Sequence, residues 1–122
     1  MSKTLTKADL AQFTGTENHY FNPLFGRQNK YSDGIKYVAE TAGAYWLIDL
    51  VLSHQIDPKA QAEEFQVWTL AKIPGTSGCT VTMTNGNDET PIIQQTVEFT
   101  DFPLDDFKMY RANDVLYLPS EH

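Results

Sequence analysis

Cysteine, histidine and aspartate are the residue types of a nucleophilic active site, and Cys79, His19 and Asp49 could supply one. In such a site the imidazole holds the cysteine as a thiolate and the carboxylate orients the imidazole. The three residues are far apart in the sequence, and no local motif brings them together. Cys79 alternates with threonines in a predicted strand, where a small buried side chain is the ordinary role. We therefore predict a structural role for Cys79 and no catalytic residue.

A pocket is nevertheless an alternative site. Asp49 interrupts an apolar run over residues 44–52, and a buried carboxylate without partners is costly, so Asp49 needs hydrogen-bond donors or an exposed edge. His19 and Tyr20 lie in a loop rich in aromatic residues, and loops anchored in this way often carry binding residues. A pocket between helix and sheet near His19, Tyr20, Asp49 and Cys79 would make the protein a small enzyme or ligand binder.

The best binding candidate is an acidic segment in the second half of the chain. Residues 73–122 hold two basic residues, Lys108 and Arg111, against eight acidic ones, a balance of −6 out of a net charge of −7. Carboxylates spaced by aromatic side chains can dock on a basic groove with fast, salt-sensitive association. The competing interpretation is a solvated turn whose aromatic residues point into the core. The predicted partner-binding residues are Glu98, Asp101, Phe102, Asp105 and Asp106.

Several classes of function lack the motifs they need. The sequence has neither a glycine-rich phosphate loop nor a Walker-type lysine, and no calcium-binding loop. Its three histidines and one cysteine lack the spacing of zinc ligands. We therefore expect no cofactor and no metal. The negative charge disfavours direct binding of nucleic acid and attracts a protein partner with a basic surface.

The first half of the chain predicts helices. Thr6 is a suitable cap for a short helix over residues 7–13. The strongest pattern predicts a central apolar helix over about residues 32–54, capped by Ser32 and kinked or broken at Gly43. Its apolar run is shorter than the roughly 20 residues of a membrane span, so we expect no membrane insertion. The segment 14–26 has turn formers and large apolar residues, which indicates an ordered cover over this helix.

The second half predicts strands. Residues 65–72, 79–84 and 91–99 alternate with a period of two, and strand pieces follow over 107–118. The motif NGND at 85–88 favours a hairpin with a type I′ turn. We therefore predict a single α+β domain over residues 1–122. In it, the central helix packs on an antiparallel sheet of three to five strands at about 64–118.

Two stretches resemble a family of small domains. FTGTENHYFNPLFG (13–26) and YSDGIKYVAETAGAYWLID (31–49) are similar to a family met in phages, plasmids and bacterial mobile elements, to which no activity is assigned. The resemblance covers most of the chain, and the residues from Phe13 to Asp49 carry it. It implies an accessory or counter-defence role, such as that of an anti-CRISPR inhibitor that binds a host nucleic-acid-handling complex. It implies no catalytic residue.

These observations favour a non-enzymatic interaction protein of the cytoplasm. The single cysteine suits a reducing compartment, and the first ten residues have no secretory apolar core. In this interpretation the acidic half, centred on Asp101 to Asp106, contacts the partner. The aromatic loop from Tyr20 to Phe25 is a candidate for a second contact or for the seam of a homodimer. A structural dimer joined through the apolar helix face is a third alternative.

Overall fold

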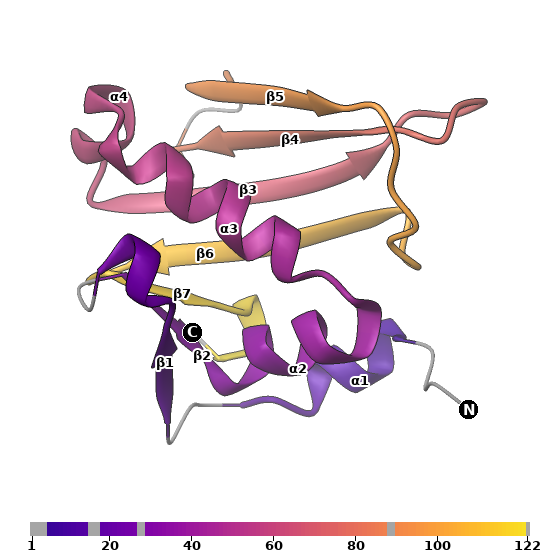
Figure 1. Ribbon diagram of the computed structural model, residues 1–122, viewed down its shortest axis with the longest axis horizontal. Coiled ribbons are helices and arrows are strands. Elements are labelled where there is room, and N and C mark those ends of the chain that lie inside the picture. The colour runs from indigo at the N-terminus through magenta and orange to yellow at the C-terminus, as the bar shows by residue number, and fades with distance from the viewer. Residues whose placement is uncertain (1–4, 15–17, 27–28, 88–89, 122) are drawn as a thin grey trace.

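A seven-stranded mixed sheet forms the frame of the molecule (Figure 1). The computed structural model describes residues 5–14, 18–26, 29–87 and 90–121. The strands follow the order β1-β2-β7-β6-β3-β4-β5, and every neighbouring pair is antiparallel except β2 with β7. Their bounds are β1 His19–Phe21, β2 Lys30–Ser32, β3 Phe65–Lys72, β4 Cys79–Thr84, β5 Ile93–Val97, β6 Asp106–Ala112 and β7 Val115–Tyr117.

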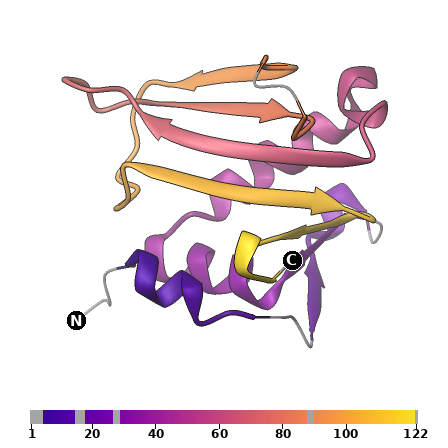
Figure 2. The same ribbon diagram turned by 180° about the vertical axis from the view of Figure 1, so that it is seen from behind.

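Helices cover one face of this sheet. Helix α3 crosses the strands on the near side in Figure 1, with α2 below it, whereas the view from behind shows no helix over β3, β4 and β5 among the described residues (Figure 2). None of the helices in this described part is long and apolar enough to cross a membrane. The helices are α1 Lys7–Ala11, α2 Asp33–Ala42, α3 Tyr45–Ser53 and α4 Pro58–Gln61, with 3-10 turns η1 Pro23–Phe25, η2 His54–Ile56 and η3 Pro119–Glu121.

The central helix predicted over about 32–54 is broken at Gly43, as its pattern indicated, so that the chain forms the two helices α2 and α3 there. Gly43 adopts a left-handed conformation with φ of 64°, and the amide of Ala44 bonds to the carbonyl of Ala39 at 2.9 Å. This is the closing pattern of a Schellman motif, in which glycine takes a conformation that costs other residues energy. The predicted caps are confirmed: Ser32 accepts from the amide of Ile35 at 3.3 Å, and Thr6 forms a capping box with Asp9.

The predicted α+β class is confirmed, but the sheet is larger than the predicted three to five antiparallel strands. The five predicted strands correspond to β3 through β7. The additional strands, β1 and β2, have three residues each; β1 lies in the segment predicted as a cover, and β2 ends at the cap of the predicted central helix. Strand β2 pairs parallel to β7, with Tyr31 opposite Leu116. Three residues are too few to produce a readable alternation, so only the pairing partner reveals these strands.

The hairpin predicted at residues 85–88 is present, because β4 and β5 pair antiparallel, but its connection is longer than the two residues of a type I′ turn. Between β4 and β5 the connection runs over residues 85–92, and Gly86, with φ of 84°, is its described residue of positive φ. Asp88, the last residue of the NGND motif, lies outside the described residues. Asn113 and Asp114 both have positive φ, 53° and 65°, and form the two-residue connection from β6 to β7. Asparagine and aspartate tolerate this conformation better than most side chains, which explains the position of the turn.

The core lies between the helices and the covered face of the sheet. Alternate residues of β3, β4 and β6 point toward α2 and α3, and Trp68 in β3 is fully buried. Burial of these apolar side chains fixes the register, since a shift by one residue would expose them. The largest fully buried side chains include Leu47, Leu52, Trp68, Leu70, Met83, Phe102, Met109 and Leu116.

Candidate functional site

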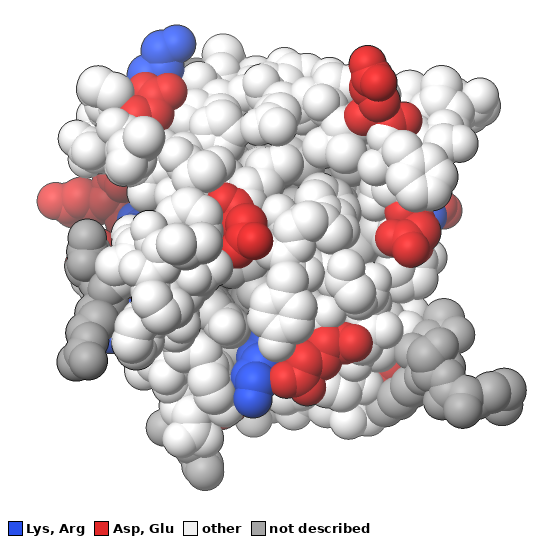
Figure 3. Space-filling model, in the orientation of Figure 1, with Lys and Arg blue, Asp and Glu red and all other residues white. Residues whose placement is uncertain are grey.

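The connection from β5 to β6, residues 98–105, is named here the acidic loop. Its carboxylates at Glu98, Asp101 and Asp105 are exposed, and the side chain of Phe99 is 71% exposed. In the space-filling view of the helix-covered face, Asp and Glu side chains lie along the edge where this loop runs, and Lys and Arg atoms are sparse (Figure 3). The loop therefore offers an aromatic side chain and negative charge together.

The acidic loop is anchored from within by Phe102. This side chain is fully buried, and its ring centroid lies 5.2 Å from that of Phe107. The main chain is also tied down, because the amide of Thr100 bonds to the carbonyl of Ser77 at 2.7 Å. At the other end of the loop the carbonyl of Asp105 accepts from the amide of Lys72 at 2.9 Å. These bonds hold the loop in one conformation, with Phe99 pointing outward.

Two of the predicted partner-binding residues have different surroundings from those expected. Phe102 is buried, so it supports the loop and has no surface with which to contact a partner. Asp106 is the first residue of β6 and pairs with Lys7 of α1 at 2.8 Å. The hydrogen bond and charge of Lys7 lower the pKa of Asp106. Glu98, Asp101 and Asp105 remain exposed, and Phe99 is the contact candidate that the sequence-based prediction did not include.

The residues of the predicted alternative pocket are held by other contacts. The hydroxyl of Tyr20 donates to Asp33 at 2.9 Å, and this hydrogen bond raises the pKa of Tyr20. Asp49 is half-buried, and its carboxylate accepts from the side-chain amide of Asn22 at 3.3 Å. His19 is exposed in the edge strand β1. Tyr20 and Asp49 therefore have structural partners.

Cys79 is not near His19. Four strands, β2, β7, β6 and β3, separate β1 from β4 in the sheet. At a spacing of about 4.8 Å per strand, the two lie roughly 24 Å apart across the sheet. Cys79 is also fully buried, and burial raises the pKa of its thiol, which disfavours the reactive thiolate. The structure therefore does not bring Cys79 and His19 together.

The predicted second contact, the aromatic loop from Tyr20 to Phe25, exposes an aliphatic side chain most strongly and one aromatic ring to a lesser degree. Leu24 in η1 is 86% exposed, whereas Phe21 is 39% exposed. Asn22 caps η1 by accepting from the amide of Leu24 at 3.0 Å, which fixes this turn. The loop therefore presents one large aliphatic side chain on an ordered turn.

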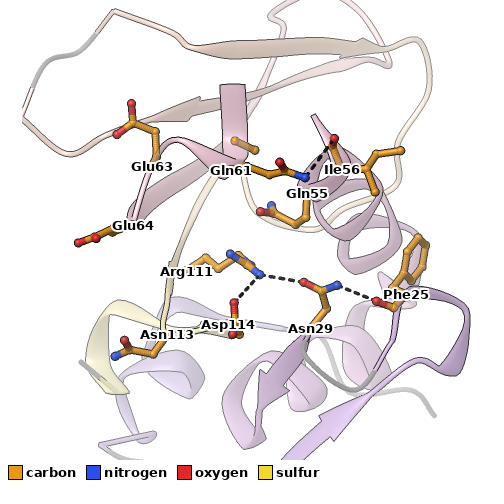
Figure 4. A pocket seen from close by; sticks show the side chains of 11 residues that line it. Phe25, Asn29, Gln55, Ile56, Gln61, Glu63, Glu64, Arg111, Asn113 and Asp114 are labelled. Carbon is orange, nitrogen blue, oxygen red and sulfur yellow. Dashed lines mark hydrogen bonds and ion pairs between the residues drawn. The ribbon is translucent and has the colours of Figure 1, made fainter. Parts of the chain in front are cut away.

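A hollow of the surface, named here the Arg111 pocket, lies on the helix-covered side of the sheet beside the turn from β6 to β7. It has a volume of about 660 Å³ and lies between the η2–α4 segment and the β6–β7 turn (Figure 4). No sequence motif predicted it, since its residues come from three distant stretches of the chain, 25–29, 55–64 and 111–114. Its lining residues are Phe25, Asn29, Gln55, Ile56, Ala60, Gln61, Glu63, Glu64, Arg111, Asn113 and Asp114.

Arg111 points into this pocket from the covered face of the sheet (Figure 4). Its side chain is only 11% exposed, and its Nη2 donates to Asn29 at 2.8 Å and to Asp114 at 3.4 Å. Nε is buried without a hydrogen-bond partner among the described residues. Burial lowers the pKa of the guanidinium, against the opposing effect of Asp114. The charge of Arg111 is therefore poorly compensated by its neighbours.

The wall behind Arg111 is a fully bonded amide cluster. Gln55 and Gln66 exchange two hydrogen bonds of 3.0 Å, and Gln66 also donates to the carbonyl of Ala60 at 3.0 Å. The indole of Trp68 donates to Gln66 at 2.8 Å. Such a satisfied buried network rigidifies its surroundings.

One sequence signal does point to Arg111. It follows Phe107 and Met109 at every second position of β6, on the face that points toward the core, where a charged residue is unusual.

The described residues form no cluster of metal-binding side chains. No group of three or more histidine, cysteine, aspartate or glutamate side chains is placed among these residues to hold an ion. The acidic loop and the Arg111 pocket lie toward opposite ends of β3.

Comparison with known proteins gives a family for the chain. The model of a family of unknown function, DUF6876, matches residues 4–122, so the chain belongs to this family. No curated protein and no solved structure matches it. The family description carries no activity.

Proposed function

We propose that this member of the DUF6876 family is a non-enzymatic interaction protein whose acidic loop occupies a basic surface of a partner protein. The observation that carries this proposal is the 71% exposure of Phe99, flanked by Glu98 and Asp101, on an anchored loop. Aromatic side chains supply much of the binding energy at protein interfaces, and complementary charge gives fast and specific association. A loop that is already ordered loses little conformational entropy on binding.

The proposed partner is a nucleic-acid-handling complex of a bacterial host, and the protein would act there as an inhibitor in the cytoplasm. The net charge of −7 supports a partner with a basic surface, because such a field attracts basic proteins. Surfaces that bind nucleic acid are basic, so an acidic protein with exposed carboxylates can compete for them. The origin from a phage or mobile element is part of the proposal and rests on the sequence resemblance. Leu24 would supply a second, apolar contact.

Affinity capture from a host lysate at low and high salt tests this proposal. We expect the folded protein to retain a basic nucleic-acid-handling complex at low salt and to lose it at high salt. The decisive variant reverses Asp101 and Asp105 to lysine. The matched control reverses Glu63 and Glu64 to lysine, which changes the net charge by the same amount at the opposite end of β3.

Reversal in the acidic loop should abolish capture, whereas the control should weaken it only slightly. Equal loss with both variants would point to the overall charge and not to the loop. Retention by a folded Asp101→Lys, Asp105→Lys variant would refute the proposal. A triple variant that also reverses Asp106 is less informative, because that change places a lysine beside Lys7 and disturbs the contact between α1 and β6.

A further inference from the structure

We propose that the Arg111 pocket binds the carboxylate group of a small, singly charged ligand or of a peptide chain end. This inference is independent of the proposed role of the acidic loop, since the two features share no residue. It depends on how the guanidinium is held, on the charges around it and on the apolar side chains that share the cavity.

The guanidinium of Arg111 has unused donors. A guanidinium carries five N–H groups in a planar fork that matches a carboxylate in two parallel hydrogen bonds. Here both hydrogen bonds, to Asn29 and Asp114, come from Nη2, and the structure gives Nη1 no partner within the described residues. Because each edge of the fork includes an Nη2 hydrogen, a ligand carboxylate would take the place of Asp114 and accept from Nη2 and Nη1 together. The ion pair with Asp114 is long, at 3.4 Å, and the Asp114 side chain is 60% exposed. A buried charge with so weak a counter-ion is costly, and a carboxylate in the pocket would compensate it.

Asn29 fixes the orientation of the guanidinium. It is 9% exposed, its carbonyl oxygen accepts from Arg111, and its amide donates to the carbonyl of Phe25 at 2.6 Å. Both functional groups of Asn29 are therefore used to position Arg111. The amide cluster of Gln55 and Gln66 closes the wall behind it, so the site is formed before any ligand arrives.

The surrounding charges select the type of anion. Glu63, Glu64 and Asp114 line the same pocket and repel any anion, and this repulsion is larger for a phosphate dianion than for a singly charged carboxylate. Phe25 and Ile56 lie on the side of the cavity away from these glutamates (Figure 4). They offer apolar contact to an aliphatic or aromatic group. The volume of about 660 Å³ falls within the range of small-ligand sites.

Two sources of such a carboxylate are a free amino acid and the C-terminal residue of a peptide. The first also carries an ammonium group, which the glutamates of the rim would attract, whereas the second does not. Titrations of the labelled full-length protein, followed by amide NMR, distinguish them with four probes: leucine, N-acetylleucine, leucinamide and inorganic phosphate.

Carboxylate-containing leucine and N-acetylleucine should shift the amide signals of Asn29 and of residues 111–114, and leucinamide and phosphate should not. Tighter binding of leucine than of N-acetylleucine would support the amino acid, and the reverse order or equal affinities would support the chain end. Absence of shifts with every probe would mean that the pocket holds only water and would overturn the proposal. Phosphate binding as tight as that of the carboxylates would also overturn it.

Two variants test the role of Arg111. Arg111→Lys keeps the charge but removes the planar fork, and it should weaken binding of N-acetylleucine by about tenfold or more. Asp114→Asn removes the competing carboxylate at a position with φ of 65°, which asparagine tolerates, and it should tighten binding. Unchanged affinity in both folded variants would refute the proposal. If Arg111→Lys fails to fold, Asp114→Asn and the probe series still decide.

Discussion

Replacement of Phe102 by alanine tests whether the acidic loop is anchored from within, as the structure indicates. The matched control is Phe99→Ala, three residues earlier in the same loop. Phe102 is fully buried and packs on Phe107, whereas Phe99 is 71% exposed. The two substitutions remove the same atoms, so their difference reports the environment of each ring.

The expected difference is large. Replacement of a buried phenylalanine by alanine typically lowers the free energy of unfolding by about 3–5 kcal/mol, through lost apolar burial and the cavity that remains. The contact between the rings of Phe102 and Phe107 places the cost toward the upper part of that range. An exposed side chain away from other features changes stability by less than about 0.5 kcal/mol. We therefore expect at least a sixfold ratio between the two costs, roughly 3 against 0.5 kcal/mol.

Urea unfolding followed by tryptophan fluorescence measures both costs, because Trp68 is in the core. With a slope of about 1.5 kcal/mol per molar urea, a loss of about 4 kcal/mol moves the midpoint by roughly 2.7 M. The Phe99→Ala midpoint should stay within about 0.3 M of wild type. A Phe102→Ala cost below about 1 kcal/mol would refute the argument that this ring anchors the loop. Phe99→Ala should have the opposite profile in partner capture: the variant should remain folded but bind the partner weakly.

Three further changes test other parts of the structure. Gln66→Leu leaves the indole of Trp68 and the carbonyl of Ala60 without their hydrogen bonds to Gln66. Urea unfolding should therefore show a free energy of unfolding lower by roughly 2–5 kcal/mol. An unchanged midpoint would show that the amide cluster does not stabilise the fold. Gly43→Ala has free space for its Cβ but a φ of 64°, so thermal unfolding should report a loss of about 1 kcal/mol from backbone strain alone. Asp106 has a pKa below its ordinary value because of Lys7. Its contribution to stability is therefore complete above the unfolded-state pKa of about 3.9 and is lost as the pH falls through the folded-state pKa. Asp106→Asn should accordingly lose less stability than wild type between about pH 6 and pH 3 in urea titrations, and identical losses would show that the pair does not stabilise the fold.

Features that depend on a few neighbouring residues were predictable from the chain alone. Thr6 and Ser32 cap their helices as expected, because a hydroxyl at that position satisfies an amide of the first turn wherever the helix lies. Strands β3 and β4 were readable from their alternation, and Gly43 was recognised as a point where the helix could break. The α+β class followed from the order of these patterns, since helices come first and long strands later.

Features that depend on contacts between distant segments were not predictable. Strands β1 and β2 are too short for a periodic pattern and exist because β7 offers a partner edge to β2. The same sheet order separates His19 from Cys79, which the sequence left free to meet. The opposite roles of Phe99 and Phe102 follow from the path of the loop over the core. The side chain of Arg111 contacts Asn29 and Asp114 only in the folded chain. Its burial and its charge pairing therefore depend on the tertiary structure, and no short stretch of sequence contains them.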